Sequence, residues 1–176
     1  MSSNLKLSVT PADHTAGGSS AEFVLLEYGD YQCSHCGDAY LVIKKLQEEF
    51  GPRLQYVFRH FPLTETHIYA KAAAIAAEAA AAQGKFWEMH NIMYENQNKL
   101  NSTGLVNFAQ KIGLDVEQFK KDIRDEKFTS LVEDAYEEGR RLGVNYTPTY
   151  FLNGQRFGGG SKDLYTMLHS TATGNK

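Results

Sequence analysis

The sequence predicts an α/β protein, and three observations support this fold class. Two short segments near the N-terminus have the composition of strands, and a segment of helical periodicity joins them. The middle of the chain has helical periodicity without strand signals. Strand signals return on both sides of Asn153-Gly154, the strongest short signal for a hairpin, and a last helix follows.

The N-terminal part is expected to form a strand–helix–strand unit. Residues 22–28 are a nearly continuous apolar run, which suits a strand buried on both faces, and residues 54–58 alternate as a second strand. Steps of four, three and four residues between apolar side chains predict the helix between them: Ala39, Ile43, Leu46 and Phe50. Before this unit, residues 5–9 alternate and suggest an edge strand, and residues 15–21 suggest a Gly/Ser-rich connector.

The middle block is expected to consist of five helices. Ten of the thirteen residues from 70 to 82 are alanine, the strongest helix former, and Gly84 suits the end of this helix. Asp115 and Gln118 have the spacing of a capping box, which would open another helix. Apolar faces predict the rest of the block around residues 86–93, 105–112, 115–124 and 128–142.

The C-terminal part is expected to return to the sheet. Residues 149–152 and 155–157 read as the two strands of the hairpin. Ser161 is a good N-cap, so the last helix is expected to begin there.

Charge and hydropathy exclude two classes of partner. Lys and Arg number 18 against 21 Asp and Glu, a net charge of −3, whereas nucleic-acid binding usually needs a basic surface. The longest purely apolar run, residues 72–77, is far shorter than the ~20 residues of a membrane helix. The first residues lack the apolar core of a signal peptide. The expected location is therefore cytoplasmic, or periplasmic or extracellular if the sequence is a processed form.

The two cysteines, Cys33 and Cys36, are too close in sequence to stabilise a fold greatly as a disulfide. They follow the predicted buried strand and lie at the start of a helix, where unpaired N–H groups and the helix dipole favour a thiolate. A thiolate is the attacking species in disulfide exchange. We therefore expect Cys33 to be a redox-active nucleophile and Cys36, one turn further on, to resolve a mixed disulfide.

Three neighbouring residues are candidates for supporting roles. His35 can place a donor or a positive charge beside the Cys33 sulfur, or else lies in solvent without a role. Glu27 would be costly to bury in an apolar strand without a use, and it could relay the proton of Cys36; alternatively it is exposed at the strand end. Ser34 either caps the helix start or is exposed, where it is a candidate substrate contact.

Four segments resemble the DsbA-like thiol:disulfide oxidoreductases of the thioredoxin superfamily: VLLEYGDYQCSHC, HFPL, QGKFWEMHNIMYENQ and GVNYTPTYFLNG. The resemblance covers about residues 21–168. It implies a thioredoxin fold formed by residues 1–62 and 144–176, interrupted by an inserted helical domain over residues 63–143.

The resemblance also implies roles for single residues. Cys33 would be the nucleophile, Cys36 the resolving thiol and Glu27 the carboxylate beneath them. Pro148 matches the cis-proline that faces the cysteines, and Thr147 would contact the backbone of the substrate. Ser34 stands where many periplasmic members have proline, which leaves the redox potential and the net direction of exchange open.

The sequence thus predicts a thiol:disulfide oxidoreductase that acts as a monomer on protein or peptide thiols and disulfides, with a separate redox-recycling partner and with no cofactor or metal. Two alternatives are a zinc-binding module that uses the cysteines with histidines, and a non-catalytic thioredoxin-fold adaptor. Zinc sites want four ligands, and no second CxxC or HxxxH pair exists in the chain. The histidines at 60, 67 and 90 are expected to be structural or surface residues, and Asp30 to shape the strand-to-helix turn.

Overall fold

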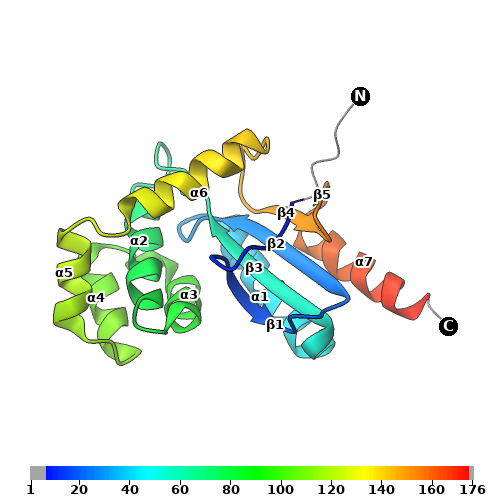
Figure 1. The fold of residues 1–176 in the computed structure, drawn as a ribbon, viewed down its shortest axis with the longest axis horizontal. Helices are drawn as coiled ribbons and strands as arrows, with labels where there is room; N and C mark the ends of the chain where they lie inside the picture. The colour runs from blue at the N-terminus through cyan, green and yellow to red at the C-terminus, as the bar shows by residue number, and fades with distance from the viewer. Residues whose placement is uncertain (1–6, 175–176) are drawn as a thin grey trace. The chain divides into compact units, whose positions relative to one another are not determined.

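The computed structural model describes residues 7–174, and its elements are labelled in Figure 1. In chain order they are β1 (His14–Gly17), β2 (Phe23–Gly29), α1 (Ser34–Phe50), the 3-10 helix η1 (Gly51–Arg53), β3 (Leu54–His60), α2 (Ala70–Ala81), α3 (Phe86–Glu95), the 3-10 helix η2 (Gln97–Lys99), α4 (Ser102–Lys111), α5 (Val116–Arg124), α6 (Thr129–Arg141), β4 (Thr149–Leu152), β5 (Gln155–Phe157) and α7 (Ser161–Thr173).

The chain divides into two compact units, each of which is discontinuous in sequence. The first, which we call the sheet unit, contains the residues up to 28, residues 38–59 and the residues from 148 on. The second, the helical unit, contains residues 29–37 and 60–147. Helix α1 therefore has its first turn in the helical unit and the remainder in the sheet unit.

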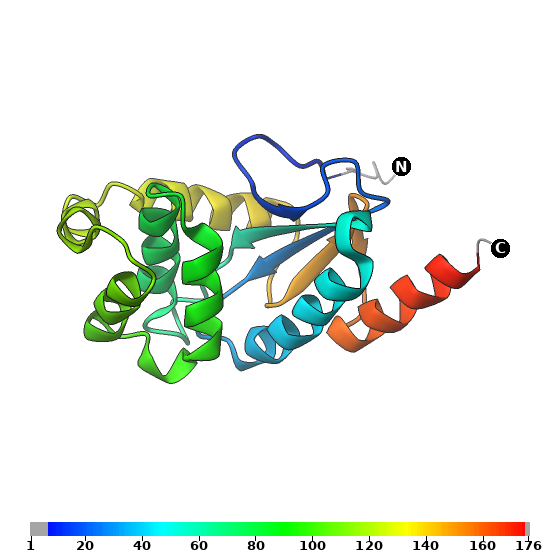
Figure 2. The same cartoon turned by 90° about the horizontal axis from the view of Figure 1, so that it is seen from below.

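The sheet unit is built on a five-stranded sheet with the order β1-β3-β2-β4-β5. β1 pairs antiparallel with β3, and β4 pairs antiparallel with both β2 and β5. β2 and β3 are neighbours that point the same way in Figure 2, as strands joined by a crossover helix do. In the hairpin, Asn153 and Gly154 have φ values of 48° and 82°, the left-handed conformation of a type I′ turn. The predicted strand–helix–strand unit and hairpin are confirmed.

The edge strand predicted at residues 5–9 is wrong. The edge strand is β1, which lies within and just before the segment predicted as a connector. Residues 7–10 form no strand, and the Leu7 N–H donates to the carbonyl of Gly154 at 2.9 Å instead of entering a ladder. Leu5 lies outside the described residues. The alternation of apolar residues in this segment is too short to distinguish a strand from a segment that is held by isolated hydrogen bonds.

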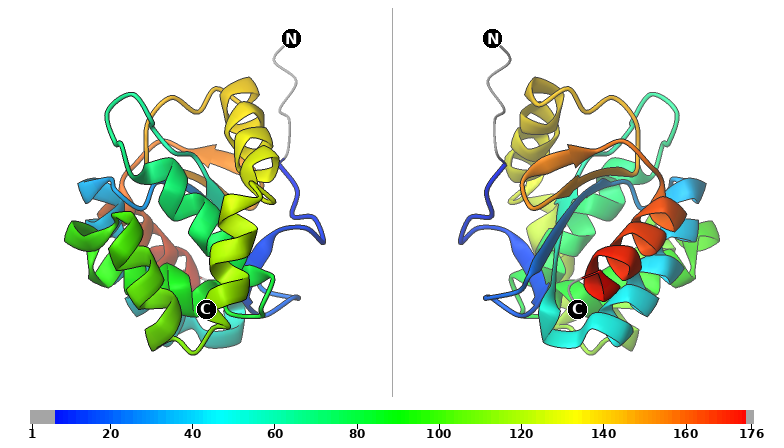
Figure 3. Two further views of the ribbon diagram at one scale, coloured as in Figure 1. Left: turned by 90° about the vertical axis from the view of Figure 1, so that its left-hand side faces the viewer. Right: turned by 90° about the vertical axis from the view of Figure 1, so that its right-hand side faces the viewer.

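Helices α1 and α7 lie side by side on one face of the sheet (Figures 2 and 3). The apolar residues that predicted α1 are all buried: Ala39, Ile43, Leu46 and Phe50. The Tyr165 hydroxyl on α7 donates to Glu49 on α1 at 3.0 Å. The N-cap of α7 is Gly160, one residue before the predicted Ser161, because the Asp163 carboxylate accepts the Gly160 N–H at 2.8 Å.

The helical unit contains α2 to α6, in agreement with the predicted block of five helices (Figures 1 and 3). Helix α2 contacts the other four helices, and seven of its alanines are buried. Because alanine side chains are small, neighbouring helices can approach α2 closely. Gly84, Gly113 and Gly143 follow helix ends with φ between 75° and 80°, a conformation that favours glycine.

The capping box predicted at the start of α5 is only half formed. Asp115 is the N-cap, and its carboxylate accepts the N–H of Gln118 at 2.9 Å. The Gln118 side chain donates to Asp122 rather than returning to Asp115. The N–H of Asp115 instead donates to the Gln83 side chain at 2.8 Å. A partner distant in sequence thus takes the place of the local one.

A buried ion pair fixes the N-terminal segment to the sheet. The Arg59 guanidinium bonds both carboxylate oxygens of Asp13, at 2.7 and 2.8 Å, and also donates to the Tyr28 hydroxyl and the Ser8 carbonyl. Each side chain of the ion pair is only 7% exposed. Burial opposes the ionisation of Asp13, but the bonds and charge of Arg59, with bonds from Thr10, outweigh it and lower the pKa of Asp13 below its ordinary 3.8.

Replacement of Asp13 by asparagine should destabilise the protein by about 3 kcal/mol at pH 7, because Arg59 would be buried without its anion. A carboxyl whose folded pKa is lowered contributes stability above its unfolded pKa, and that contribution is lost as the pH falls through the folded pKa. The difference between Asp13→Asn and wild type in urea unfolding should therefore shrink in acid. Asp134→Asn, on the exposed face of α6, is the matched control. An equal difference at neutral and acid pH would contradict this role.

Candidate active site

The Cys33 loop, which we define as residues 30–37, turns the chain from β2 into α1. The Asp30 carboxylate accepts the N–H of Gln32 at 2.7 Å, and the Asp30 carbonyl accepts the N–H of Cys33 at 3.1 Å. Cys33 immediately precedes α1, and its carbonyl accepts the N–H of Gly37 at 3.1 Å, the first bond of the helix. The prediction that Asp30 shapes this turn is confirmed.

The Cys33 sulfur is strongly stabilised as a thiolate, because its pKa is lowered from 9.0 to about 5. The largest cause is a hydrogen bond from the Cys36 thiol. Burial works in the opposite direction, and further bonds from the Thr147 side chain and from the backbone N–H groups of Cys36 and His35 add to the lowering. Both cysteines are free thiols; Cys33 is 6% exposed and Cys36 is fully buried. Only Cys33 therefore keeps any accessible surface.

Thr147 contacts Cys33 from a distant part of the helical unit. As a thiol, Cys33 lies 3.5 Å from the Thr147 carbonyl and donates to it. The Thr147 hydroxyl is buried and has no other hydrogen-bond partner within residues 7–174. This hydroxyl is therefore free to bond the sulfur when Cys33 ionises, in agreement with its effect on the pKa.

Ser34 and His35 are exposed at the first turn of α1. The contribution of His35 to the lowered pKa of Cys33 comes from its backbone N–H. A backbone group of any residue at this position could supply that bond. The His35 imidazole and the Ser34 hydroxyl are instead accessible to molecules that approach the site.

The remaining predicted residues, Glu27 and Pro148, belong to the sheet unit. Glu27 is 2% exposed on β2, so the alternative of an exposed glutamate is wrong. Its carboxylate accepts the Tyr56 hydroxyl at 2.7 Å, and it stands opposite Tyr150 of β4. Pro148 is half-buried and directly precedes β4. The structure thus brings Cys33, Cys36 and Thr147 together in one unit, and describes Glu27 and Pro148 in the other.

Sequence reasoning missed the side chains that hold the Cys33 loop from the rest of the helical unit. Asp30 accepts the Leu63 N–H at 2.9 Å and bonds His67 at 2.8 Å. The Tyr31 hydroxyl lies 3.0 Å from His90 Nδ1. The histidines at 67 and 90 are structural, as predicted, but their task is to hold this loop.

Two further contacts complete the support of the loop. The Gln32 side chain accepts the Tyr69 N–H at 2.7 Å. The Gln97 side chain donates to the carbonyls of Tyr31 and Cys33 at 2.8 and 2.9 Å. Gln97 and His90 both fall in the QGKFWEMHNIMYENQ segment, so the motif was visible in the sequence although its contacts were not.

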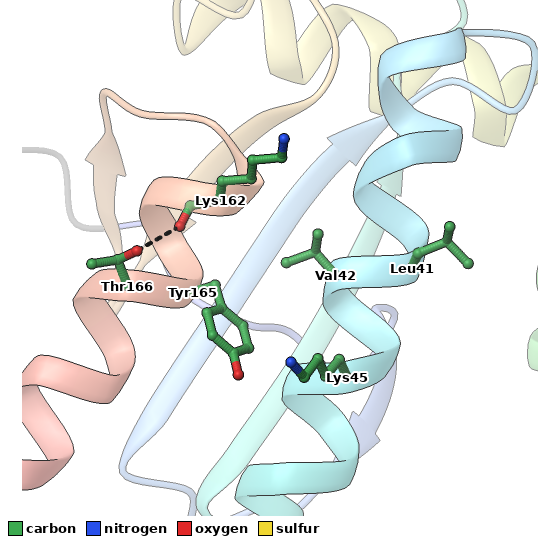
Figure 4. A pocket seen from close by; sticks show the side chains of 6 residues that line it. All are labelled: Leu41, Val42, Lys45, Lys162, Tyr165 and Thr166. Carbon is green, nitrogen blue, oxygen red and sulfur yellow. Dashed lines mark hydrogen bonds between the residues drawn. The ribbon is translucent and has the colours of Figure 1, made fainter.

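The sheet unit also contains a cavity of about 420 Å³ between α1 and α7 (Figure 4). Its walls carry aliphatic, lysine and hydroxyl-bearing side chains: Leu41, Val42 and Lys45 from α1, and Lys162, Tyr165 and Thr166 from α7. The lining contains no thiol. This cavity therefore offers no group for cysteine chemistry, and the candidate active site is the Cys33 loop.

Comparison with known proteins agrees with this site and fold. A family model described as Thioredoxin matches residues 9–168. The chain belongs to the thioredoxin family, and its fold is the DsbA-like form of the thioredoxin fold.

Two solved structures illustrate the likeness. A thioredoxin-like oxidoreductase from Silicibacter pomeroyi DSS-3 is 25% identical, with a TM-score of 0.79 over 93% of this chain and 94% of that one. Wolbachia pipientis alpha-DsbA1 is 22% identical, with a TM-score of 0.80 over 97% of this chain and 98% of that one.

Curated relatives are similar in sequence over part of their length. The chain is 43% identical over 149 residues to the Na(+)/H(+) antiporter NhaA 1 of Mycobacterium sp. (strain KMS), which covers 84% of this chain and 24% of that protein. It is 42% identical over 166 residues to NhaA 1 of Mycolicibacterium vanbaalenii, which covers 93% and 27%. The chain thus spans about a quarter of the length of the curated relatives it matches. Within residues 7–174, no helix is both long enough and apolar enough to cross a membrane.

Substitution of Cys36 separates its effect on the Cys33 thiolate from other causes. Cys36→Ala removes the donor that lowers the pKa most, so the midpoint of Cys33 alkylation against pH should rise by about one to two units. Cys36→Ser keeps a donor at the same place and should shift the midpoint less. The measurement is the rate of iodoacetamide modification across pH. A midpoint near 5 in Cys36→Ala would contradict the assigned cause.

Proposed function

We propose that this chain is a thiol:disulfide oxidoreductase that exchanges disulfides with protein or peptide substrates through Cys33 and Cys36. The observation that carries the proposal is the lowered pKa of Cys33, about 5, beside a fully buried second thiol. Cys33 is ionised at neutral pH, and its 6% exposed fraction is the surface at which a substrate sulfur can approach. The adaptor alternative gives a thiol activated in this way no task, and a zinc module would need ligands beyond the two cysteines.

The exchange follows from these two thiols. When the Cys33–Cys36 disulfide oxidises a substrate dithiol, a substrate thiolate attacks the Cys33 sulfur, the bond between the two cysteines breaks, and Cys36 leaves and gains a proton. The second substrate thiolate then attacks the substrate sulfur of the mixed disulfide. The substrate disulfide forms, Cys33 leaves as a thiolate, and two electrons have passed to the protein. A thiolate of low pKa is a good leaving group, so release of the product is favoured.

The other predicted residues have supporting roles in this proposal. Glu27, buried and bonded to Tyr56, accepts or supplies the proton of Cys36. Pro148 and Thr147 contact the extended backbone of the substrate, and Ser34 and the His35 imidazole contact it from the first turn of α1. Burial of the Glu27 carboxyl supports its use in proton transfer, since burying such a group is otherwise costly.

The wider assignments are part of the same proposal. Residues 1–62 and 144–176 form the thioredoxin-fold domain, and residues 63–143 form an inserted helical domain. The chain acts as a monomer with a separate redox-recycling partner. A strongly stabilised thiolate makes the disulfide oxidising, which favours a periplasmic or extracellular location over the cytoplasmic one expected from the sequence.

Turnover with a model substrate tests the proposal directly. The protein should reduce insulin in the presence of dithiothreitol and oxidise a reduced two-cysteine peptide. Cys33→Ser should abolish both activities, because it removes the attacking sulfur. Cys36→Ser should instead accumulate a mixed disulfide with the peptide, visible by mass spectrometry. Full turnover by Cys33→Ser would overturn the proposal.

The stability of the two redox forms should depend on pH. The folded pKa of Cys33 lies below its unfolded value, so the reduced form gains stability as pH rises from about 5 towards 9.0, and loses it as pH falls through the folded value. The gain is about 3 kcal/mol at pH 7, and the disulfide form lacks it because it has no thiolate. Melting curves of both forms across this range should show the reduced form melting higher at pH 7. A more stable disulfide form throughout would indicate a reducing protein.

A further inference from the structure

We propose that Gln97 is a positioning residue, which holds the backbone of the Cys33 loop so that the N–H groups of the next turn face the Cys33 sulfur. The inference rests on the proposed function, because it takes Cys33 as the reacting thiol. Gln97 begins η2, and both it and the loop belong to the helical unit.

One Gln97 side-chain nitrogen bonds two carbonyls of the loop. Nε2 donates to the Tyr31 oxygen at 2.8 Å and to the Cys33 oxygen at 2.9 Å. These carbonyls lie on the last residues before α1 begins. An amide NH₂ has two hydrogens, so each can serve one carbonyl. The contact therefore fixes the Tyr31–Gln32 and Cys33–Ser34 peptide planes, which flank the Gln32–Cys33 peptide.

The position of the Cys33 carbonyl controls the first turn of α1. This oxygen also accepts the N–H of Gly37, the first intrahelical bond. The N–H groups of His35 and Cys36 lie between these two residues and bond the Cys33 sulfur. If the Cys33 peptide plane rotates, the first helical bond is strained and the N–H groups turn away from the sulfur. Gln97 thus acts on the sulfur through the backbone, without touching it.

The other side of the Gln97 amide is fitted against Gly37. A Cβ added to Gly37 would lie 2.2 Å from Gln97 Oε1 and 2.8 Å from its Cδ. Gly37 has no positive φ that would itself call for glycine. A side chain at residue 37 would therefore displace the Gln97 amide from the place where it bonds the loop.

Three substitutions at position 97 would each lose part of this contact. Glutamate has the same shape, but its ionised carboxylate accepts and cannot donate to two carbonyls. Asparagine is one methylene shorter and would not reach both oxygens. Alanine leaves the carbonyls without this donor.

The test is the pH dependence of Cys33 alkylation, which measures the thiol whether or not the protein turns over a substrate. Gln97→Ala should raise the midpoint by about half to one pH unit, and Gln97→Glu should raise it further because it adds a like charge. The control is Asn98→Ala, an exposed neighbour on η2, which should leave the midpoint unchanged. A midpoint within about 0.2 units of wild type in both Gln97 variants would overturn the inference.

A second pair of variants tests the fit between residues 37 and 97. Gly37→Ala should displace the Gln97 amide and raise the alkylation midpoint as Gln97→Ala does. In the Gln97→Ala background the same Gly37→Ala change should add no further shift, because the amide is already gone. Additive shifts in the double variant would show that the two residues act independently and would also overturn the inference. The proposed function has a separate test, which is insulin reduction by the wild-type protein. If the wild type did not reduce insulin, the proposed function would be wrong, whatever the alkylation midpoints of the variants.

Discussion

Between the end of β2 and the start of α1 the chain must turn so that backbone N–H groups point at the Cys33 sulfur. This constraint explains much of the helical unit. The pKa of Cys33 is low because the Cys36 thiol, the Thr147 side chain and two backbone N–H groups converge on it, and each contribution depends on direction as well as distance. A nearby positive charge would stabilise the thiolate even if the loop were loosely held, whereas hydrogen bonds to the sulfur require a fixed loop.

The helical unit supplies the rigidity that the constraint demands. Four of its segments bond successive residues of the Cys33 loop: residues 63–67, Tyr69, His90 and Gln97. Helix α2 separates residues 63–67 and Tyr69 from His90, which lies within α3, and from Gln97, which follows α3. These groups come together only when the unit has folded. The Cys-Ser-His-Cys sequence is therefore insufficient for the thiolate stabilisation observed here. A short peptide with that sequence would lack both the Thr147 bond and the restraint on the backbone.

The sequence predicted those features that depend on neighbours in the chain. The periodicity of α1, the alanine-rich α2 and the Asn153-Gly154 turn are local signals, and the elements that they predicted are present, with the two cysteines at the start of α1. The edge strand and the capping box failed, because distant groups competed for the same backbone: Gly154 takes the Leu7 N–H, and Gln83 takes the Asp115 N–H. The bonds of His67, His90 and Gln97 to the Cys33 loop could not be predicted, since nothing in the sequence around a polar residue identifies a partner that is distant in the chain.

The discontinuity of the sheet unit has a consequence for synthesis on the ribosome. The Val24 N–H bonds the Asn153 side chain, 129 residues later in the chain. One edge of β2 therefore remains unpaired until β4 has been synthesised, on the order of ten seconds later at typical elongation rates. During this time residues 60–147 are made and can pack among themselves. An apolar strand with an unpaired edge invites association with other chains. The β2 edge of a nascent chain is accordingly open to other chains during that interval, and slower translation of the helical block would lengthen its exposure.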